Sequence, residues 1–168
     1  MLITETQSAR GAASTATPSD PALAVTQDGS AAEGLTGANR RLIRVLIVDD
    51  HRAVRSALTA FLLAYDDLEL AGEASDGVEA LHFCERQQPD VVLMDLMMPR
   101  MDGASATRAI RTVYPQTQVL ILTGSYEKRL LREALRAGAV GHWHKEVTSD
   151  ELAHAIRAAY QGHPVVTP

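Results

Sequence analysis

From Arg41 onward, short apolar runs alternate with stretches in which apolar residues recur every three or four positions. The runs predict buried β-strands, and the recurring positions predict helices that bury one face. Five strand-helix pairs follow one another before Gly162. Continuous apolar strands that alternate with helices are typical of a parallel sheet with helices on both faces, so we expect an α/β fold.

The five strands are expected at 43–48, 68–74, 91–94, 119–122 and near 140–144. The signals between them fit helix boundaries, because Pro89 ends the second helix and Gly138 ends the fourth. The last helix is expected to begin with a capping box, in which Thr148 is the N-cap residue and Glu151 follows three positions later.

The residues before Arg41 have a different texture, rich in Ala, Thr, Ser and Gly and without helical or strand periodicity. Such a segment buries too little apolar surface to offset the entropy lost on ordering. We therefore expect a disordered tail over 1–40, one folded domain over 41–162, and a C-terminal tail or the start of a linker over 163–168.

Composition narrows the class of protein. The 168 residues carry a net charge of −5, which argues against direct nucleic-acid binding by this chain. No apolar run approaches the ~18 residues of a membrane span, and no secretory signal is visible, so we expect no membrane association. Cys84 is the single cysteine, which suits a reducing cytoplasm and predicts a small core residue.

Polar side chains stand where four of the five expected strands end. Asp49 and Asp50 follow the first strand, Asp95 the third, Thr123 the fourth and Lys145 the fifth. Each alone has an ordinary structural explanation, such as a helix cap or a loop residue. Because the carboxyl ends of parallel strands form one ligand-binding edge, we expect all five residues to meet there.

Carboxylates gathered at one point repel each other and attract a divalent cation. Oxygen ligands without His or Cys favour Mg²⁺ or Mn²⁺. With Lys145 to neutralise charge and Thr123 to donate a hydrogen bond, the group is equipped for phosphoryl transfer, with Asp95 as the nucleophile.

Four segments together resemble the receiver domains of two-component response regulators. They are Val-Asp-Asp-His at 48–51, Asp-Leu-Met-Met-Pro-Arg-Met-Asp-Gly at 95–103, Leu-Thr-Gly at 122–124, and Gly-Ala-Val-Gly at 138–141 leading to Lys145. Glu146 and the Thr-Ser-Asp-Glu-Leu run after it resemble the NarL/FixJ-type (LuxR-family) subfamily. The resemblance implies a flavodoxin-like (βα)5 doubly wound parallel sheet with strand order 2-1-3-4-5, and a receiver domain over 41–162.

The resemblance also implies roles for individual residues. Asp95 would be the phosphoacceptor, and Thr123, Gly124 and Lys145 would contact the phosphoryl group. The implied metal ligands, for Mg²⁺ or Mn²⁺, are Asp50 directly, Asp49 through water, Asp95, and the backbone carbonyl of Met97.

Positions 97 and 125 flank the path of the water that removes the phosphoryl group in such receivers. Met97 and Ser125 occupy them here. Because the apolar Met97 side chain cannot orient water, we expect slow self-dephosphorylation.

Receivers usually place Tyr or Phe three residues before the lysine, as a switch residue coupled to the threonine. This chain has His142 there. Either the coupling of Thr123 to residue 142 is altered and pH-sensitive, since imidazole titrates near neutrality, or His142 is a tolerated surface substitution. A zinc pair of His142 with His144 is disfavoured because no third ligand is nearby in sequence, and Trp143 is expected in the core.

The implied partner is a sensor histidine kinase, and a homodimer of the phosphorylated form is a second interaction to consider. The arginines at 129, 132 and 136 share one helix face and would form a partner-binding rim or, as we prefer, a solvated surface. Related receivers usually precede a helix-turn-helix domain, and Pro168 falls where a linker to one would begin. A stand-alone receiver and a truncated chain both remain open.

The expected function is a cytoplasmic phosphorelay switch that controls a downstream output, and not an enzyme beyond self-phosphorylation and self-dephosphorylation. One alternative is a receiver that binds partners without phosphorylation. An aspartyl-phosphate phosphohydrolase is less favoured, because those enzymes place an Asp-x-Asp pair after the first strand. A nucleotide or flavin carrier is the weakest alternative, because no Gly-rich loop follows the first strand.

Overall fold

The computed structural model describes residues 41–124, 128–145 and 148–165. The expected N-terminal tail over 1–40, Ser125, Glu146 and the last three residues lie outside this part. The described residues form five strands and five helices in strict alternation. In chain order these are β1 (Ile43–Val48), α1 (Arg52–Leu62), β2 (Leu68–Ala74), α2 (Gly77–Gln87), β3 (Val91–Met94), α3 (Gly103–Val113), β4 (Gln118–Thr123), α4 (Lys128–Arg136), β5 (Gly141–His144) and α5 (Ser149–Tyr160).

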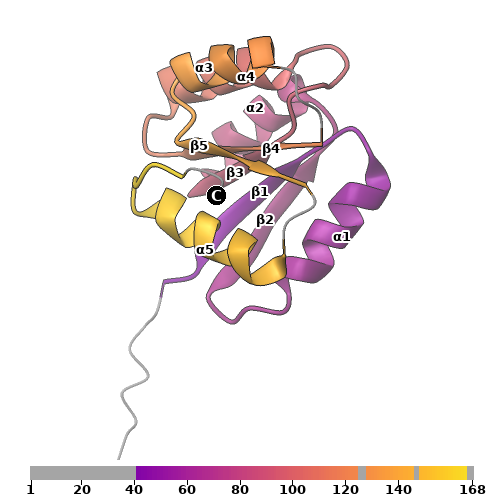
Figure 1. The fold of residues 1–168 in the computed structure, drawn as a ribbon, viewed down its shortest axis with the longest axis vertical. Coiled ribbons are helices and arrows are strands. Elements are labelled where there is room, and N and C mark those ends of the chain that lie inside the picture. Colours follow the sequence, from indigo (N-terminus) through magenta and orange to yellow (C-terminus); the bar gives the residue numbers. More distant parts are fainter. Residues whose placement is uncertain (1–40, 125–127, 146–147, 166–168) are drawn as a thin grey trace, which may run out of the picture. The chain divides into compact units, whose positions relative to one another are not determined.

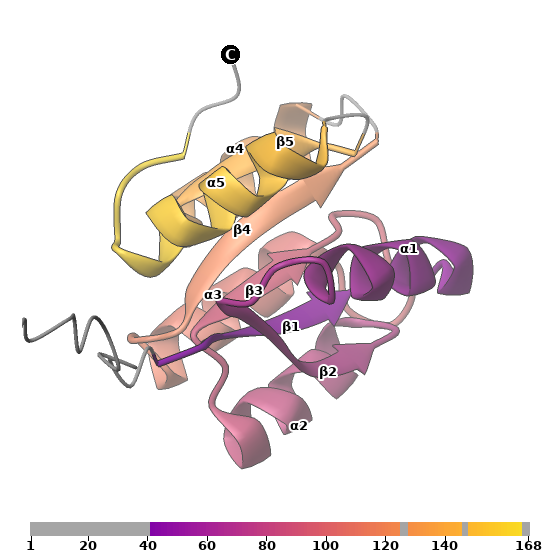
Figure 2. The same ribbon diagram turned by 90° about the horizontal axis from the view of Figure 1, so that it is seen from below.

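The strands pair in parallel in the order β2-β1-β3-β4-β5, which confirms the expected fold class (Figure 1). Helices α1 and α5 cover one face of this sheet, and α2, α3 and α4 cover the other (Figure 2). The central strands β1, β3 and β4 are mostly apolar because successive side chains enter opposite buried layers. In β1, Val45 and Ile47 pack on the α1/α5 side, while Leu46 and Val48 pack on the α2/α3/α4 side.

Side chains fix the beginnings of several helices. The Asp76 carboxylate accepts from the backbone N–H groups of Val78 (2.8 Å) and Glu79 (3.0 Å) at the start of α2. At α5, the Glu151 carboxylate accepts from both the backbone N–H (3.1 Å) and the hydroxyl (2.7 Å) of Thr148. These contacts satisfy donors at or near helix N-termini, and they place the loops that precede the helices.

The chain turns back onto the sheet after α5. Val165 lies in the segment expected to be a tail or the start of a linker, yet it is buried and belongs to the α1/α5-side core. Its N–H donates to the carbonyl of Val140 (2.9 Å), and it forms a parallel bridge with Gly141. A Cβ at position 141 would lie 1.8 Å from the Val165 carbonyl oxygen, so this close approach requires glycine.

No helix among residues 41–124, 128–145 and 148–165 combines the length and the hydrophobicity that a membrane crossing needs.

Candidate functional site

Three charged side chains meet at the carboxyl ends of the strands. Asp49 follows β1, Asp95 follows β3 and Lys145 follows β5. The Lys145 Nζ lies 2.5 Å from Asp49 Oδ2 and 2.9 Å from Asp95 Oδ1. The central strands β1 and β3 bring the two carboxylates side by side, and the ammonium bridges them from the far edge of the sheet.

This group is largely shielded from solvent. Asp49 is 1% exposed and Asp95 is 6% exposed. Burial raises the pKa of Asp95 above its ordinary value, and the negative charge of Asp49 adds to this, while the contact with Lys145 opposes it. Burial lowers the pKa of Lys145, but its hydrogen bonds to Asp49 and Asp95 and the charges of both carboxylates together outweigh burial and raise it. The ammonium therefore stays charged between two closely spaced carboxylates.

Asp50 stands at the exposed rim of the same site, beside His51. The His51 Nδ1 lies 2.7 Å from Asp50 Oδ1, and the backbone N–H of His51 donates to Asp49 Oδ1 (2.8 Å). Ligand atoms of Asp49, Asp50 and His51 lie within 4.8 Å of one another, which makes these three a candidate cation-binding cluster. His51 was not predicted to be a site residue, although its place directly after the aspartate pair was a signal in the sequence. In the structure it is the N-cap residue of α1.

Arg55 also supports the site and was not anticipated. Its Nη1 donates to the backbone carbonyl of Asp49 (2.7 Å), and its Nε donates to Glu73 Oε2 (3.1 Å). The other Glu73 oxygen accepts from the Thr59 hydroxyl (2.8 Å). This chain of contacts fixes the backbone at the end of β1 against α1 and β2.

Thr123 and Gly124 lie at the end of β4, next to the lysine. Thr123 is buried, and its carbonyl accepts from the backbone N–H of Lys145 (3.1 Å). Gly124 is exposed, and a Cβ there would lie 3.7 Å from Lys145 Cδ, an ordinary contact distance. The lysine stem thus passes Gly124 on its way to the two carboxylates. Ser125, the other expected site residue here, lies outside the described residues.

The loop between β3 and α3 folds back over the end of β3. The Gly103 N–H donates to the Leu96 carbonyl (3.0 Å), and a Cβ on Gly103 would lie 2.0 Å from the Asp95 carbonyl oxygen. The Met97 side chain points outward, since this residue is 53% exposed.

The residues before Lys145 alternate along β5. Trp143 is buried in the α1/α5-side core, as expected, whereas His142 and His144 are half-buried. Among the described residues, the cluster of three or more close metal-ligand candidates is the one at Asp49, and it does not include the two histidines.

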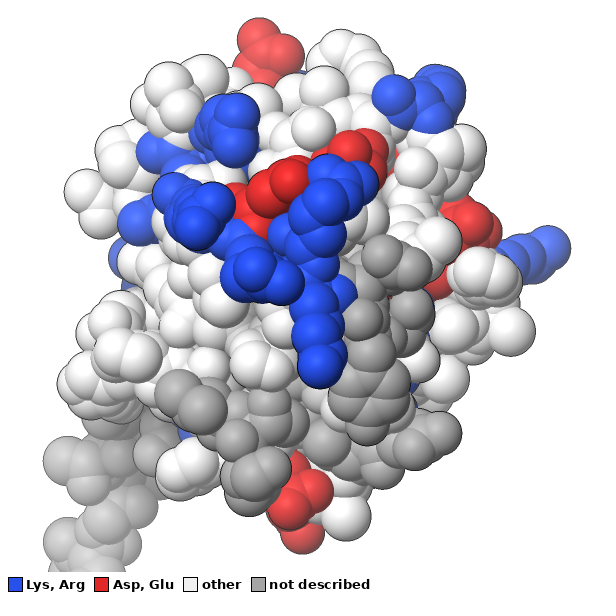
Figure 3. All heavy atoms as spheres, turned by 45° about the horizontal axis from the view of Figure 1, so that its top comes forward, with Lys and Arg blue, Asp and Glu red and all other residues white. Residues whose placement is uncertain are grey.

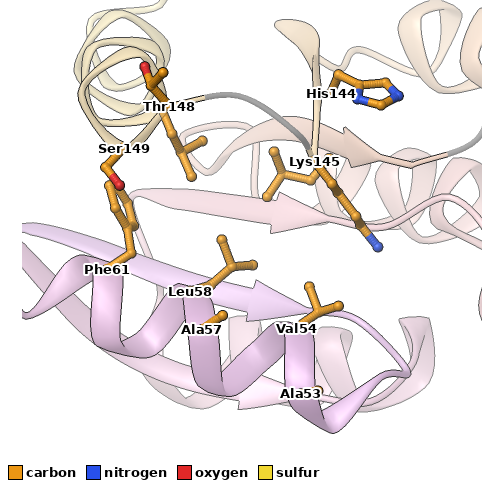
Figure 4. A pocket seen from close by; sticks show the side chains of 11 residues that line it. Ala53, Val54, Ala57, Leu58, Phe61, His144, Lys145, Thr148 and Ser149 are labelled. Carbon is orange, nitrogen blue, oxygen red and sulfur yellow. The ribbon is translucent and has the colours of Figure 1, made fainter.

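A hollow of about 390 Å³ opens beside the site, between α1 and α5 (Figure 4). Its walls are mostly apolar and include Val54, Leu58, Phe61 and the stem of Lys145. The α1 residues that the sequence pattern placed on an apolar face are therefore only partly covered. Within α1, which is described throughout, Leu62 is the single fully buried residue.

Basic side chains gather over α3 and α4, on the face turned forward in Figure 3. Arg129, Arg132 and Arg136 are all exposed, and Arg129 pairs with Glu133 at 2.7 Å within the helix. This arrangement agrees with the interpretation of a solvated charged surface, because an exposed pair of this spacing adds only a few tenths of a kcal/mol.

Comparison with known proteins assigns the family. Residues 45–157 match the response regulator receiver domain. The transcriptional regulatory protein LiaR of Bacillus subtilis is 42% identical over 123 residues, which are 73% of this chain and 58% of LiaR. The response regulator protein VraR of Staphylococcus epidermidis is 36% identical over 126 residues, which are 75% of this chain and 60% of VraR. This chain thus spans about three-fifths of the length of these curated relatives.

The comparison with solved structures supports the same family. The signal receiver domain of the putative response regulator NarL from Mycobacterium tuberculosis has a TM-score of 0.70 and 33% identity, covering 73% of this chain and 99% of that one. The match of family, relatives and fold extends over the strands that carry Asp49, Asp95 and Lys145. The chain belongs to the response regulator receiver family, and its relatives place it in the NarL/FixJ-type (LuxR-family) group.

Proposed function

We propose that this receiver domain accepts a phosphoryl group on Asp95, in a reaction that depends on Mg²⁺, and changes conformation to control a downstream output. The observation that carries the proposal is the position of Lys145, whose Nζ contacts both Asp49 and Asp95 in a buried pocket. A lone nucleophilic carboxylate needs a cation to offset the charge of an incoming phosphoryl group, and the ammonium is already there.

The donor atoms at this edge fit Mg²⁺, and Mn²⁺ as its close substitute. The carboxylates of Asp49, Asp50 and Asp95 and the backbone carbonyl of Met97 are all hard oxygen ligands. His51 adds one nitrogen at the exposed rim. When bound, the divalent cation would offset negative charge on the phosphoryl oxygens.

The side chains have separate tasks in the transfer. The Asp95 carboxylate attacks phosphorus in line with the leaving group, and the bond between phosphorus and the donor breaks as the acyl phosphate forms. Lys145 pairs with the new phosphoryl oxygens in place of the carboxylates. The Thr123 hydroxyl and the Gly124 N–H would donate to the same group. The pairing of β4 with β5 holds the backbones of Thr123 and Lys145 next to each other.

The proposed partner is a sensor histidine kinase, with a phosphohistidine as the donor, and a small acyl phosphate would be a second donor. The apolar hollow between α1 and α5 supports this, because it opens beside Lys145 and offers apolar surface to a partner helix (Figure 4). Such a kinase phosphorylates its substrate in the cytoplasm, where we place this chain. We also propose that the phosphorylated form associates as a homodimer.

The relatives support a transcriptional output. LiaR is named a transcriptional regulatory protein, and we infer transcriptional control through a DNA-binding region outside these 168 residues. The chain itself would act as a switch, in which each molecule accepts one phosphoryl group and does not turn over the donor catalytically. These 168 residues would not themselves contact DNA, in keeping with their net charge of −5.

Two further positions tune the switch in this proposal. The exposed, apolar Met97 cannot orient an attacking water, so the phosphoryl group should persist, and Ser125 is the second position of this kind. Met97→Asn should shorten the half-life of the phosphorylated form, measured after removal of the donor. His142 would couple to Thr123, and a conformational shift on phosphorylation that is the same at pH 6 and pH 8 would count against a role for its titration.

Intact-mass spectrometry after incubation with acetyl phosphate and Mg²⁺ tests the main proposal. The wild-type chain should gain one phosphoryl group, while Asp95→Ala and the wild type in EDTA should gain none. A wild-type chain that gains no mass, or an Asp95→Ala variant that gains as much, would overturn the assignment. Continuous release of phosphate far beyond one equivalent on a short timescale would favour a phosphohydrolase.

A further inference from the structure

The loop between β3 and α3 is fastened at two points. Its neck is closed by the hydrogen bond from the Gly103 N–H to the Leu96 carbonyl (3.0 Å). Its tip is joined to the start of α2, where the Gly77 N–H donates to the Met101 carbonyl (3.2 Å) and Arg100 pairs with Asp76. Met97 lies between these two fastenings.

In the ion pair between Arg100 and Asp76, the carboxylate is buried in the core. Asp76 is 1% exposed, and its Oδ1 is occupied by the N–H groups that it caps at the start of α2. The guanidinium of Arg100 meets the other oxygen, Oδ2. A carboxylate this deeply buried retains its charge most readily when each oxygen has a donor, so the pair ties the loop tip to a fixed point of the core.

The backbone at Arg100 also indicates that its side chain matters. Its φ is +64°, in the left-handed region that glycine adopts freely and L-residues avoid. Glycine would adopt this conformation without steric cost. An arginine held there against its backbone preference is consistent with a compensating contact, and Asp76 supplies one.

We propose that Arg100 is a positioning residue for the metal side of the site. Through its pair with Asp76 it holds the loop so that the backbone carbonyl of Met97 faces the carboxylates. The exposed Met97 side chain cannot do this itself, so the carbonyl depends on the loop's fastenings. The inference rests on the proposed function, because it assumes that this carbonyl is a ligand of the divalent cation.

The test measures Mg²⁺ affinity of the full, unphosphorylated chain by isothermal titration calorimetry. Arg100→Gly should raise the Kd about fivefold, somewhat less than the ~10–100-fold loss seen when a direct partner of a metal ligand is removed. The direction is informative, because removing a cation near an acidic site should by charge alone strengthen Mg²⁺ binding. Weaker binding therefore reports lost positioning.

The folded state and the Mg²⁺ affinity together separate positioning from a merely structural role. Arg100→Gly leaves the buried Asp76 carboxylate without its guanidinium and only partly offsets this by relieving the backbone conformation at φ +64°, so its urea midpoint should fall. Without urea its circular dichroism spectrum should match that of the wild type while its Mg²⁺ affinity falls. Arg100→Lys keeps the charge and should recover part of the affinity. Arg108→Ala, an exposed arginine on α3, is the matched control and should change neither quantity.

A double-mutant cycle connects the effect to Asp76. Asp76→Asn retains an oxygen that can cap α2 but loses the charge, and it should weaken Mg²⁺ binding as Arg100→Gly does. The double variant should be no weaker than either single variant. Additive losses, or an Arg100→Gly Kd within twofold of the wild type, would overturn the inference.

The wild-type measurements separate the role of Arg100 from the proposed Mg²⁺-dependent phosphorylation of Asp95. A wild type that binds Mg²⁺ and is phosphorylated, beside an Arg100→Gly variant of unchanged affinity, refutes only the role of Arg100. A wild type that binds no Mg²⁺ refutes both.

Discussion

Replacing Lys145 by methionine should destabilise the protein in the absence of a divalent cation. The substitution keeps most of the length of the side chain and removes its charge, which leaves the buried carboxylates of Asp49 and Asp95 facing each other. Removing one partner of a buried ion pair costs about 3–5 kcal/mol. Because the Lys145 side chain is 22% exposed, we expect a value near the lower end, about 3 kcal/mol.

Urea unfolding, followed by the fluorescence of the buried Trp143, measures this loss. With a slope of about 2 kcal/mol per molar urea, 3 kcal/mol corresponds to a midpoint lower by about 1.5 M in EDTA. Mg²⁺ replaces part of the missing positive charge, so it should stabilise Lys145→Met more than the wild type. Lys128→Met, at an exposed lysine of α4, serves as the control and should unfold like the wild type. A Lys145→Met variant with the wild-type midpoint in EDTA, or with no larger gain from Mg²⁺, would refute the reasoning.

Three other measurements probe the site and the core. Burial raises the pKa of Asp95, so the folded wild type in EDTA should lose stability as pH rises through that pKa. Asp95→Asn has no carboxylate to ionise and should lose less. The difference between the melting temperatures of the variant and the wild type should therefore grow in favour of the variant between pH 4 and pH 7. Burial raises the pKa of Cys84 to about 12, so a thiol reagent at pH 8 should leave the native protein unmodified and label one thiol only after unfolding. Val165→Ala should lower the free energy of unfolding in urea by about 1–2 kcal/mol, because it removes two buried methyl groups. Val113→Ala is the control and should cost little, because Val113 is 61% exposed. Equal effects of the two substitutions would contradict the burial of Val165.

The fold was predictable because its central strands are buried on both sides. In β3 every residue is apolar, so the polar Asp95 that follows marks the end of the strand. The parallel arrangement then brings the strand ends together, so the topology accounts for the contacts of Lys145 with Asp49 and Asp95, which lie far from it in sequence. The same argument does not give distances, which depend on helix and loop packing.

The contacts that sequence patterns did not indicate join segments without any local signal. Arg100 lies in the loop between β3 and α3, and its pairing with Asp76 depends on how that loop packs against α2. Val165 sits in a short polar segment that contains Pro164, and its burial follows from the turn after α5 and from the missing side chain at Gly141. The open hollow beside α1 likewise reflects the spacing between two helices, which residue periodicity does not encode.

Chemical mapping of the phosphorylated residue tests the central claim most directly. Borohydride reduces an acyl phosphate of aspartate to homoserine, and peptide mass spectrometry then locates the change. After treatment with acetyl phosphate and Mg²⁺, we predict homoserine at position 95 alone. Homoserine at position 49 or 50, or unmodified aspartate at all three positions, would contradict the account.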